Sequence, residues 1–161
     1  MVITVSTRAS EGVYEDRSGP IIVAALTELG FEVGEPIVVP DGATVGVALR
    51  EALAGAPVVV ITTGGTGINP GDSTPEHTRT VLDRELPQLA AAICSYGVAQ
   101  GVPTAVLSRG VAGVAGRTLV VNLPGSTGGV RDGMAVLAPV LPHAVDQLAG
   151  GDHPAPPSED R

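Results

Sequence analysis

The chain of 161 residues contains no lysine, no tryptophan and a single cysteine, Cys94. Without lysine it can contain neither a Walker A loop, which places a lysine on nucleotide phosphates, nor a Schiff-base site. One cysteine excludes a disulfide framework and the zinc sites that require cysteine pairs. Aromatic residues are limited to Tyr14, Phe31 and Tyr96. The core must therefore be built from aliphatic side chains.

Positive charge is also scarce, since the nine basic residues, all arginine, face 17 acidic ones and leave a net charge of −8. This balance argues against a nucleic acid partner, because binding the phosphate backbone requires a basic surface. No apolar run approaches the roughly 18 residues of a membrane-spanning helix, and the first residues lack a signal-peptide pattern. With 43% hydrophobic residues, the composition predicts a globular cytoplasmic domain with no membrane partner.

Strand and helix patterns alternate in the first half of the chain. Residues 2–7, 31–39 and 58–62 predict strands, and residues 16–30 and 41–55 predict the helices between them. This order, completed within about 60 residues, is typical of a parallel sheet covered by helices. We therefore expect a three-layer α/β/α fold with a mostly parallel central sheet.

The second half is less regular, with helices predicted over 74–85 and 86–98, strands over 104–108 and 118–123, and a strand and turn over 111–116. The last of these predicts a small antiparallel element. Pro139 and Pro142 divide the helical pattern over 132–148 into two pieces or kink it. Residues 1–149 are expected to form the domain, and the polar, Pro-rich residues 150–161 a disordered tail.

The sequence TTGGTGINPGDSTPEHT, residues 62–78, follows the third predicted strand. It contains three closely spaced glycines, Gly64, Gly65 and Gly67. Ligands of open α/β sheets bind at the carboxyl ends of strands, where glycines let backbone N–H groups approach an anion. Thr66 adds a hydroxyl, and Thr74 begins a predicted helix whose N-terminus favours negative charge. A Rossmann fingerprint does not fit, because Pro70 occupies the place of its last glycine. The alternative is a long connection that needs glycine only for its turns.

Two aspartates are expected at this edge of the sheet. Asp41 follows the second predicted strand and Asp72 follows the third. They could converge on one cation, since paired carboxylates together with phosphate oxygens are a usual way to hold Mg²⁺. The alternatives are a helix N-cap at Asp41, worth about 1 kcal/mol, and a turn residue at Asp72.

Residues 122–129, NLPGSTGG, also lie between a predicted strand and a predicted helix. Gly125 and Ser126 could belong to a second anion-binding turn, or to a strand-to-helix turn with no ligand. The turn is not a nucleophile elbow, because Pro124 stands where that motif needs glycine.

The motif LSRG places Ser108 and Arg109 at the end of another predicted strand. Arg109 either binds a phosphate or is a solvated surface residue. The three histidines have no metal-ligand spacing, and His77 is expected to face solvent. Cys94 is expected to be a buried small side chain.

The chain resembles molybdenum-cofactor biosynthesis proteins of the Mog/MoaB type over about residues 1–148. The resemblance rests on VSTRASEGVYEDRSGP, VPDG, TTGGTGINPGDSTPEHT, LSRG and NLPG, in that order. It implies an α/β fold, commonly in a homotrimer, and the reaction of molybdopterin with ATP and Mg²⁺ to give adenylyl-molybdopterin and pyrophosphate. It also implies a molybdenum-insertion protein as a downstream partner. Two alternatives are a non-catalytic molybdopterin-binding protein of the MoaB type and a nucleotide-handling enzyme of the competence-damage type.

The resemblance also implies roles for residues. Asp41 and Asp72 match the family's catalytic, metal-binding acids. The expected substrate contacts are Gly64, Gly65, Thr66, Gly67, Thr74, Ser108, Pro124, Gly125 and Ser126. Many members carry Asp where Thr7 stands, and a Lys in the turn after Leu-Pro-Gly. Arg109 and Arg131 are the candidates to replace that Lys.

Overall fold

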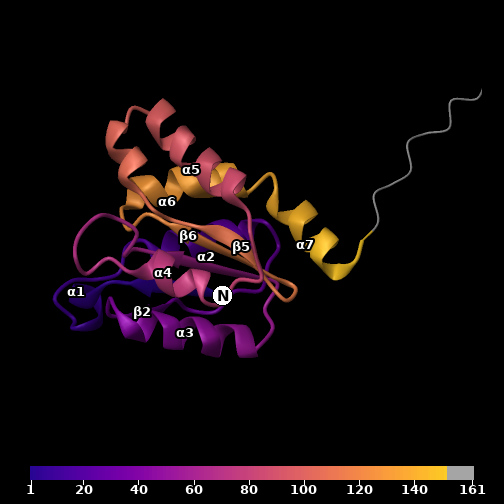
Figure 1. Ribbon diagram of the computed structural model, residues 1–161, viewed down its shortest axis with the longest axis horizontal. Helices are drawn as coiled ribbons and strands as arrows, with labels where there is room; N and C mark the ends of the chain where they lie inside the picture. The colour runs from indigo at the N-terminus through magenta and orange to yellow at the C-terminus, as the bar shows by residue number, and fades with distance from the viewer. Residues whose placement is uncertain (152–161) are drawn as a thin grey trace, which may run out of the picture.

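A six-stranded sheet lies between two layers of helices in the computed structural model, which describes residues 1–151 (Figure 1). In spatial order the strands are β2 (Ile37–Val39), β1 (Val2–Val5), β3 (Val59–Thr63), β6 (Thr118–Leu123), β5 (Ala112–Ala115) and β4 (Arg84–Glu85). The first four are parallel, and β5 and β4 extend the sheet in antiparallel fashion. The predicted α/β fold, with its antiparallel element in the second half, is confirmed.

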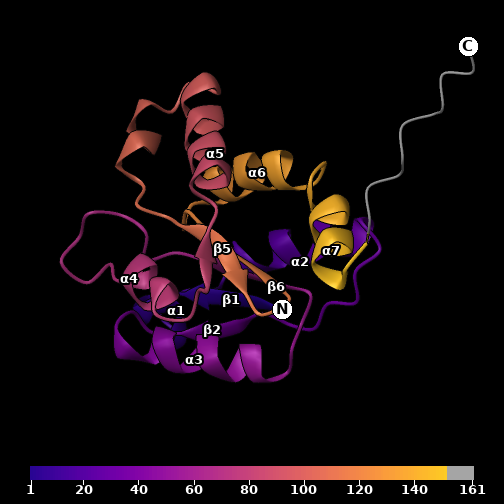
Figure 2. The same ribbon diagram turned by 45° about the vertical axis from the view of Figure 1, so that its right-hand side comes forward.

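Helices cover both faces of this sheet (Figure 2). One face carries α3 (Ala43–Ala54) and α4 (Thr74–Arg79). The other carries α2 (Gly19–Glu28), α5 (Pro87–Ala99), α6 (Thr127–Leu137) and α7 (Leu141–Ala149). Two short helices lie in connections, namely α1 (Thr7–Ser10) and the 3₁₀ helix η1 (Pro103–Leu107).

The core is aliphatic, as the composition predicts. Successive residues of β1 point to opposite faces, so Val2 packs under α2 and α6 while Ile3 packs under α3. Residues of β3 and β6 alternate in the same way and are all buried. A fully buried Ile or Leu contributes about 1.5–3 kcal/mol, so these covered strands account for much of the stability.

The strand order brings four loops to one edge of the sheet. β1 has β2 on one side and β3 on the other, so the chain crosses over in opposite directions from β1. Such a switch point opens a crevice outside the carboxyl ends of the strands. The loops that start at Ser6, Pro40, Gly64 and Pro124 all leave from these carboxyl ends.

Three predicted elements are wrong in extent or type. Of 31–39 only Ile37–Val39 is a strand, because Pro36 has no N–H to continue the ladder. The helix predicted over 74–85 ends at Arg79, and the chain then pairs with β5 through bonds such as Asp83 N–H to Val114 O, at 2.8 Å. The strand predicted over 104–108 is the 3₁₀ helix η1.

The C-terminal helical pattern is divided at its prolines, as predicted. α6 ends at Leu137 and α7 begins at Leu141, with Pro142 in its first turn. In the part of the chain that the structure covers, none of the helices is both long and apolar enough to cross a membrane. The predicted tail, 150–161, lies outside the described residues from 152 onward.

Candidate functional site

Two cavities lie at the carboxyl edge of the sheet and meet at the Gly-rich loop after β3. The larger, of about 860 Å³, extends from this loop to α5 and η1. The smaller, of about 630 Å³, lies at the switch point between β1 and β3. Gly65, Asp72 and Gly125 line both. Groups bound in the two cavities would therefore meet across these three residues.

Asp41 lines the smaller cavity and is held there by Thr7. Its Oδ2 accepts hydrogen bonds from the Thr7 N–H (3.2 Å) and hydroxyl (3.0 Å). Its Oδ1 lies on the side of Gly65, where a Cβ added to that glycine would be 2.9 Å away. The N-cap interpretation is wrong, because Gly42 is the N-cap of α3 and makes no side-chain bond.

Asp72 lines the same cavity from the far end of the Gly-rich loop. Its Oδ2 accepts a hydrogen bond from the Asn69 N–H at 3.1 Å, which closes a tight turn. A Cβ added to Gly67 would lie 2.7 Å from that oxygen. The structure thus brings Asp41 and Asp72 to one cavity, as the sequence predicts.

The oxygen atoms around Gly65 fit a hard divalent cation. The Thr74 hydroxyl is buried without a hydrogen-bond partner, and a Cβ on Gly65 would overlap it. Within residues 1–151, no group of three or more His, Cys, Asp or Glu side chains could hold a metal ion. Asp41 and Thr74 place a carboxylate and a hydroxyl oxygen beside Gly65, and Asp72 lines the same cavity as Asp41. This donor set fits Mg²⁺, which usually takes one or two carboxylates and completes its shell with phosphate oxygens and water.

The Gly-rich loop turns its carbonyl groups toward the protein. The carbonyl of Gly65 accepts from the Thr74 N–H at 3.1 Å, that of Thr66 from the Arg109 N–H at 2.8 Å, and that of Gly67 from Arg109 Nε at 2.7 Å. A trans peptide points its N–H away from its carbonyl. Accordingly, the N–H groups of Thr66, Gly67 and Ile68 donate to no acceptor in the described part of the chain.

Gly64 differs from the rest of the loop. Its N–H donates to the Leu123 carbonyl at 3.1 Å, so this N–H is not available to an anion. Its φ is +97°, and a Cβ at this position would overlap the carbonyl oxygen of Val5. Gly64 is therefore required for the close approach of the loop to β1 rather than as an anion donor.

Arg109 is neither a solvated surface residue nor at the end of a strand, since it follows η1. Besides its contact with Gly67, its Nη2 donates to the Asp72 carbonyl at 2.7 Å and its Nη1 donates to Glu76. The backbone N–H of Glu76 and the Arg109 guanidinium lower the pKa of the exposed Glu76 carboxyl. Arg131 is exposed on α6 and lines neither cavity.

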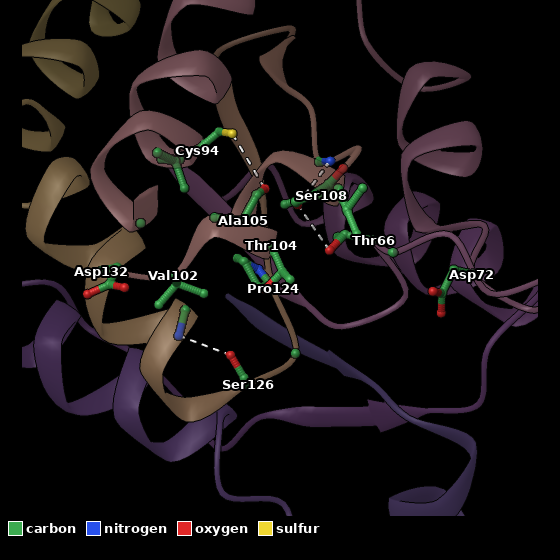
Figure 3. A pocket seen from close by; sticks show the side chains of 18 of the residues that line it. Thr66, Asp72, Cys94, Val102, Thr104, Ala105, Ser108, Pro124, Ser126 and Asp132 are labelled. Atoms are coloured by element: carbon green, nitrogen blue, oxygen red, sulfur yellow. Dashed lines mark hydrogen bonds between the residues drawn. The ribbon is translucent and has the colours of Figure 1, made fainter. Parts of the chain in front are cut away.

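The larger cavity has an apolar wall that the sequence did not predict (Figure 3). α5 and η1 supply this wall, including Cys94, which is half-buried and donates from Sγ to the Ala105 carbonyl at 3.4 Å. The Ser108 hydroxyl donates to the Thr66 hydroxyl at 3.4 Å. Asp132 and Asp72 lie at opposite sides of the view and are the charged residues of this lining.

The turn after β6 forms the wall between the cavities. Its carbonyls are fixed, since the Ser18 hydroxyl donates to Gly125 O at 2.8 Å and the Thr63 hydroxyl to Pro124 O at 2.7 Å. Ser126 is the N-cap of α6 and accepts from the Gly129 N–H at 3.1 Å. The structure thus gathers all the substrate-contact residues predicted from sequence near one edge of the sheet.

The sequence interpretation of His77 is not supported. The ring is half-buried and faces α3, where a Cβ on Gly46 would lie 3.1 Å from its Nδ1. It lines neither cavity.

An open α/β sheet with a Gly-rich loop between two cavities, and two aspartates beside it, defines a ligand-binding domain of the switch-point class. Residues 1–143 match the family model described as "Probable molybdopterin binding domain". The chain therefore belongs to the molybdenum-cofactor biosynthesis family, in its Mog/MoaB branch.

Several relatives cover most of the chain. The molybdopterin adenylyltransferase of Helicobacter pylori strain J99 is 35% identical over 153 residues, 92% of this chain and 86% of that protein. The molybdenum cofactor biosynthesis bifunctional protein of Synechococcus elongatus is 37% identical over 94% of this chain. The chain spans 48% of the length of that relative. It spans 25% of the length of the molybdenum cofactor synthesis protein cinnamon of Drosophila melanogaster.

The fold is shared with solved structures of this family. The structure of the molybdopterin biosynthesis Mog protein from Mycobacterium ulcerans is 57% identical, with a TM-score of 0.87. That similarity covers 91% of this chain and 96% of the other.

Proposed function

We propose that this protein adenylylates molybdopterin, with residues 1–149 as the catalytic unit. In this reaction a terminal phosphate oxygen of molybdopterin attacks the α-phosphorus of ATP. The bond between the α-phosphorus and the bridging oxygen breaks, and pyrophosphate leaves with the electron pair. The observation that carries the proposal is the placement of Asp41 and Asp72 in one cavity that shares a wall with a second, apolar cavity.

The two cavities differ in their basic side chains rather than in net charge, since Glu15, Asp16, Asp41 and Asp72 line the smaller one and Asp72 and Asp132 the larger. Among the residues described, the basic side chains that line either cavity are Arg8 and Arg17, and both line the smaller one. The polyanionic triphosphate therefore fits the smaller cavity, and the flat pterin fits the larger, mostly apolar one. This assignment places the reacting phosphates at Gly65 and Gly125, which line both cavities.

Catalysis by this arrangement rests on positioning and charge. A phosphate monoester is already anionic near neutral pH, so the reaction needs no strong general base, and no histidine among residues 1–151 lines either cavity. The free N–H groups of Thr66, Gly67 and Ile68 can hold phosphate oxygens in place. When bound at Asp41 and Asp72, Mg²⁺ supplies neutralisation of the charge on the leaving pyrophosphate.

The direct test is pyrophosphate release. With molybdopterin and Mg·ATP, the purified protein is expected to release one pyrophosphate per adenylylated pterin, measured by a coupled assay and mass spectrometry. ATP alone should give no release. Binding of molybdopterin without release would instead identify a non-catalytic binder. Tight nucleotide binding without molybdopterin binding would favour a nucleotide-handling enzyme.

We further propose that the chain forms a homotrimer through residues 86–107. This stretch of α5 and η1 contains no charged residue. It exposes Leu86, Tyr96, Val98, Val102, Val106 and Leu107. An exposed apolar surface of this kind is typical of a subunit interface. A molybdenum-insertion protein remains the proposed downstream partner, and the cytoplasmic location stays a prediction.

Light scattering tests this interface. The wild-type protein is expected to have three times the 16.1 kDa mass of the chain. Val106→Glu should shift the mass toward the monomer, because Val106 is 63% exposed on η1 and a carboxylate there would be buried on assembly. Val47→Glu, at a 46% exposed position on α3, is the control and should leave the mass unchanged. Equal masses for both variants would place the interface elsewhere.

A further inference from the structure

We infer that Arg109 is a positioning residue that aligns the anion-binding N–H groups of the Gly-rich loop and the backbone of Asp72, and does not itself bind phosphate. The inference rests on the proposed function only for the identity of the anion. It explains why this arginine lines neither cavity although it contacts the loop between them.

The contacts of Arg109 join both ends of the loop. Its main-chain N–H fixes the carbonyl of Thr66, its Nε fixes that of Gly67, and its Nη2 fixes that of Asp72. With the ion pair to Glu76, each of the three guanidinium nitrogens has a partner on this loop or on α4.

Because the peptide bond is planar, a carbonyl that is held by Arg109 also fixes the direction of the next residue's N–H. Fixing the carbonyl of Thr66 fixes the N–H of Gly67, and fixing the carbonyl of Gly67 fixes the N–H of Ile68. These N–H groups have no acceptor within the described residues. The main chain of Arg109 therefore sets the direction of the Gly67 N–H and its side chain that of the Ile68 N–H, and both residues line the larger cavity beside Asp72.

The geometry predicts that the shape of the guanidinium matters more than its charge. Two carbonyl oxygens, of Gly67 and Asp72, are bonded by different nitrogens of one planar group at 2.7 Å each. A lysine ammonium carries the same charge but is a compact donor on a flexible stem, which cannot reproduce this fork. A direct phosphate ligand would be replaced by lysine with little loss, since lysine also binds phosphate as a point charge.

The experiment uses inorganic phosphate, which matches the terminal phosphate proposed for the larger cavity, with calorimetry for affinity and ¹⁵N NMR for the site. In the wild type, phosphate should shift the amide signals of Gly67 and Ile68 and leave the Arg109 Nε–H signal nearly unchanged. Arg109→Lys and Arg109→Gln should both weaken phosphate binding by about tenfold. Both should also reduce the amide shift of Ile68, whereas Gly67 keeps the main-chain bond between Arg109 and Thr66.

Two variants serve as controls. Glu76→Gln should change affinity by less than about twofold, because the Glu76 side chain is 52% exposed and an exposed ion pair contributes little. Arg131→Gln removes one positive charge outside both cavities and should have no effect. The same spectra show whether each variant is folded.

Three results would overturn the inference. They are full affinity in Arg109→Lys together with loss in Arg109→Gln, a dominant shift of the Arg109 Nε–H in the wild type, and no amide shift at Gly67 or Ile68. The proposed function fails separately. Phosphate binding with the predicted variant pattern but no adenylylation of molybdopterin would leave the role of Arg109 standing and reject the reaction.

Discussion

Asp41→Asn and Asp72→Asn are each expected to lower the turnover of adenylyl transfer by about 100-fold, or about 2.7 kcal/mol in transition-state stabilisation. Each removes a negative charge from the cavity proposed to hold Mg²⁺, so charge neutralisation of the leaving group should be lost. The turnover is measured as pyrophosphate release at saturating ATP and molybdopterin. The dependence on Mg²⁺ concentration should weaken in both variants.

Both substitutions should leave the fold intact, for reasons visible in the structure. An asparagine oxygen at position 41 can still accept from the Thr7 N–H, and one at position 72 can still accept from the Asn69 N–H. Circular dichroism should therefore give unchanged unfolding curves. Asp146→Asn on α7, whose carboxylate lines neither cavity, is the matched control. Wild-type turnover in both variants would reject the metal-binding role of these aspartates.

Gly64→Ala is expected to lower the free energy of unfolding by about 3 kcal/mol and to abolish adenylyl transfer. The added methyl group would meet the carbonyl oxygen of Val5, and a φ of +97° disfavours any side chain. The loop and β1 would have to separate, and the wall between the cavities would move with them. Urea unfolding followed by circular dichroism measures the effect, since the chain has no tryptophan.

Gly30→Ala separates the steric overlap of the added methyl group from the cost of the left-handed backbone conformation. Gly30 also has a positive φ, +87°, but a Cβ there would meet nothing within 4 Å. This variant should lose only about 1 kcal/mol, the cost of the left-handed conformation, and keep full activity. If Gly64→Ala behaved like Gly30→Ala, close contact between the loop and β1 would not be required.

The position of the site at one edge of the sheet was predictable, because it follows from the order of strands and helices along the chain. Apolar runs that become β1, β2, β3 and β6 identify the parallel strands, and parallel strands end at the same edge. That reasoning is enough to bring Asp41 and Asp72 together. The glycine spacing after β3 likewise predicts an anion-binding turn, and the structure adds that the N–H groups of Thr66, Gly67 and Ile68 have no acceptor among the described residues.

Contacts between distant residues were not predictable in this way. Thr7 holds Asp41 across 34 positions, and Arg109 holds Gly67 across 42. Such pairs depend on how loops from different strands meet, and no local pattern encodes them. The misassignment of residues 104–108 has the same origin, because a β-branched, apolar segment becomes a strand only where a sheet edge is open to it.

The wall that both cavities share has a consequence for the end of the reaction. Adenylylated pterin would span Gly65 and Gly125 and occupy both cavities at once, so the two sets of contacts would act together on a single molecule. Such a conjugate should dissociate more slowly than either of its precursors. Release of the adenylylated pterin, rather than adenylyl transfer, would then limit turnover. A downstream protein that takes the product directly from this edge of the sheet would therefore raise the turnover rate.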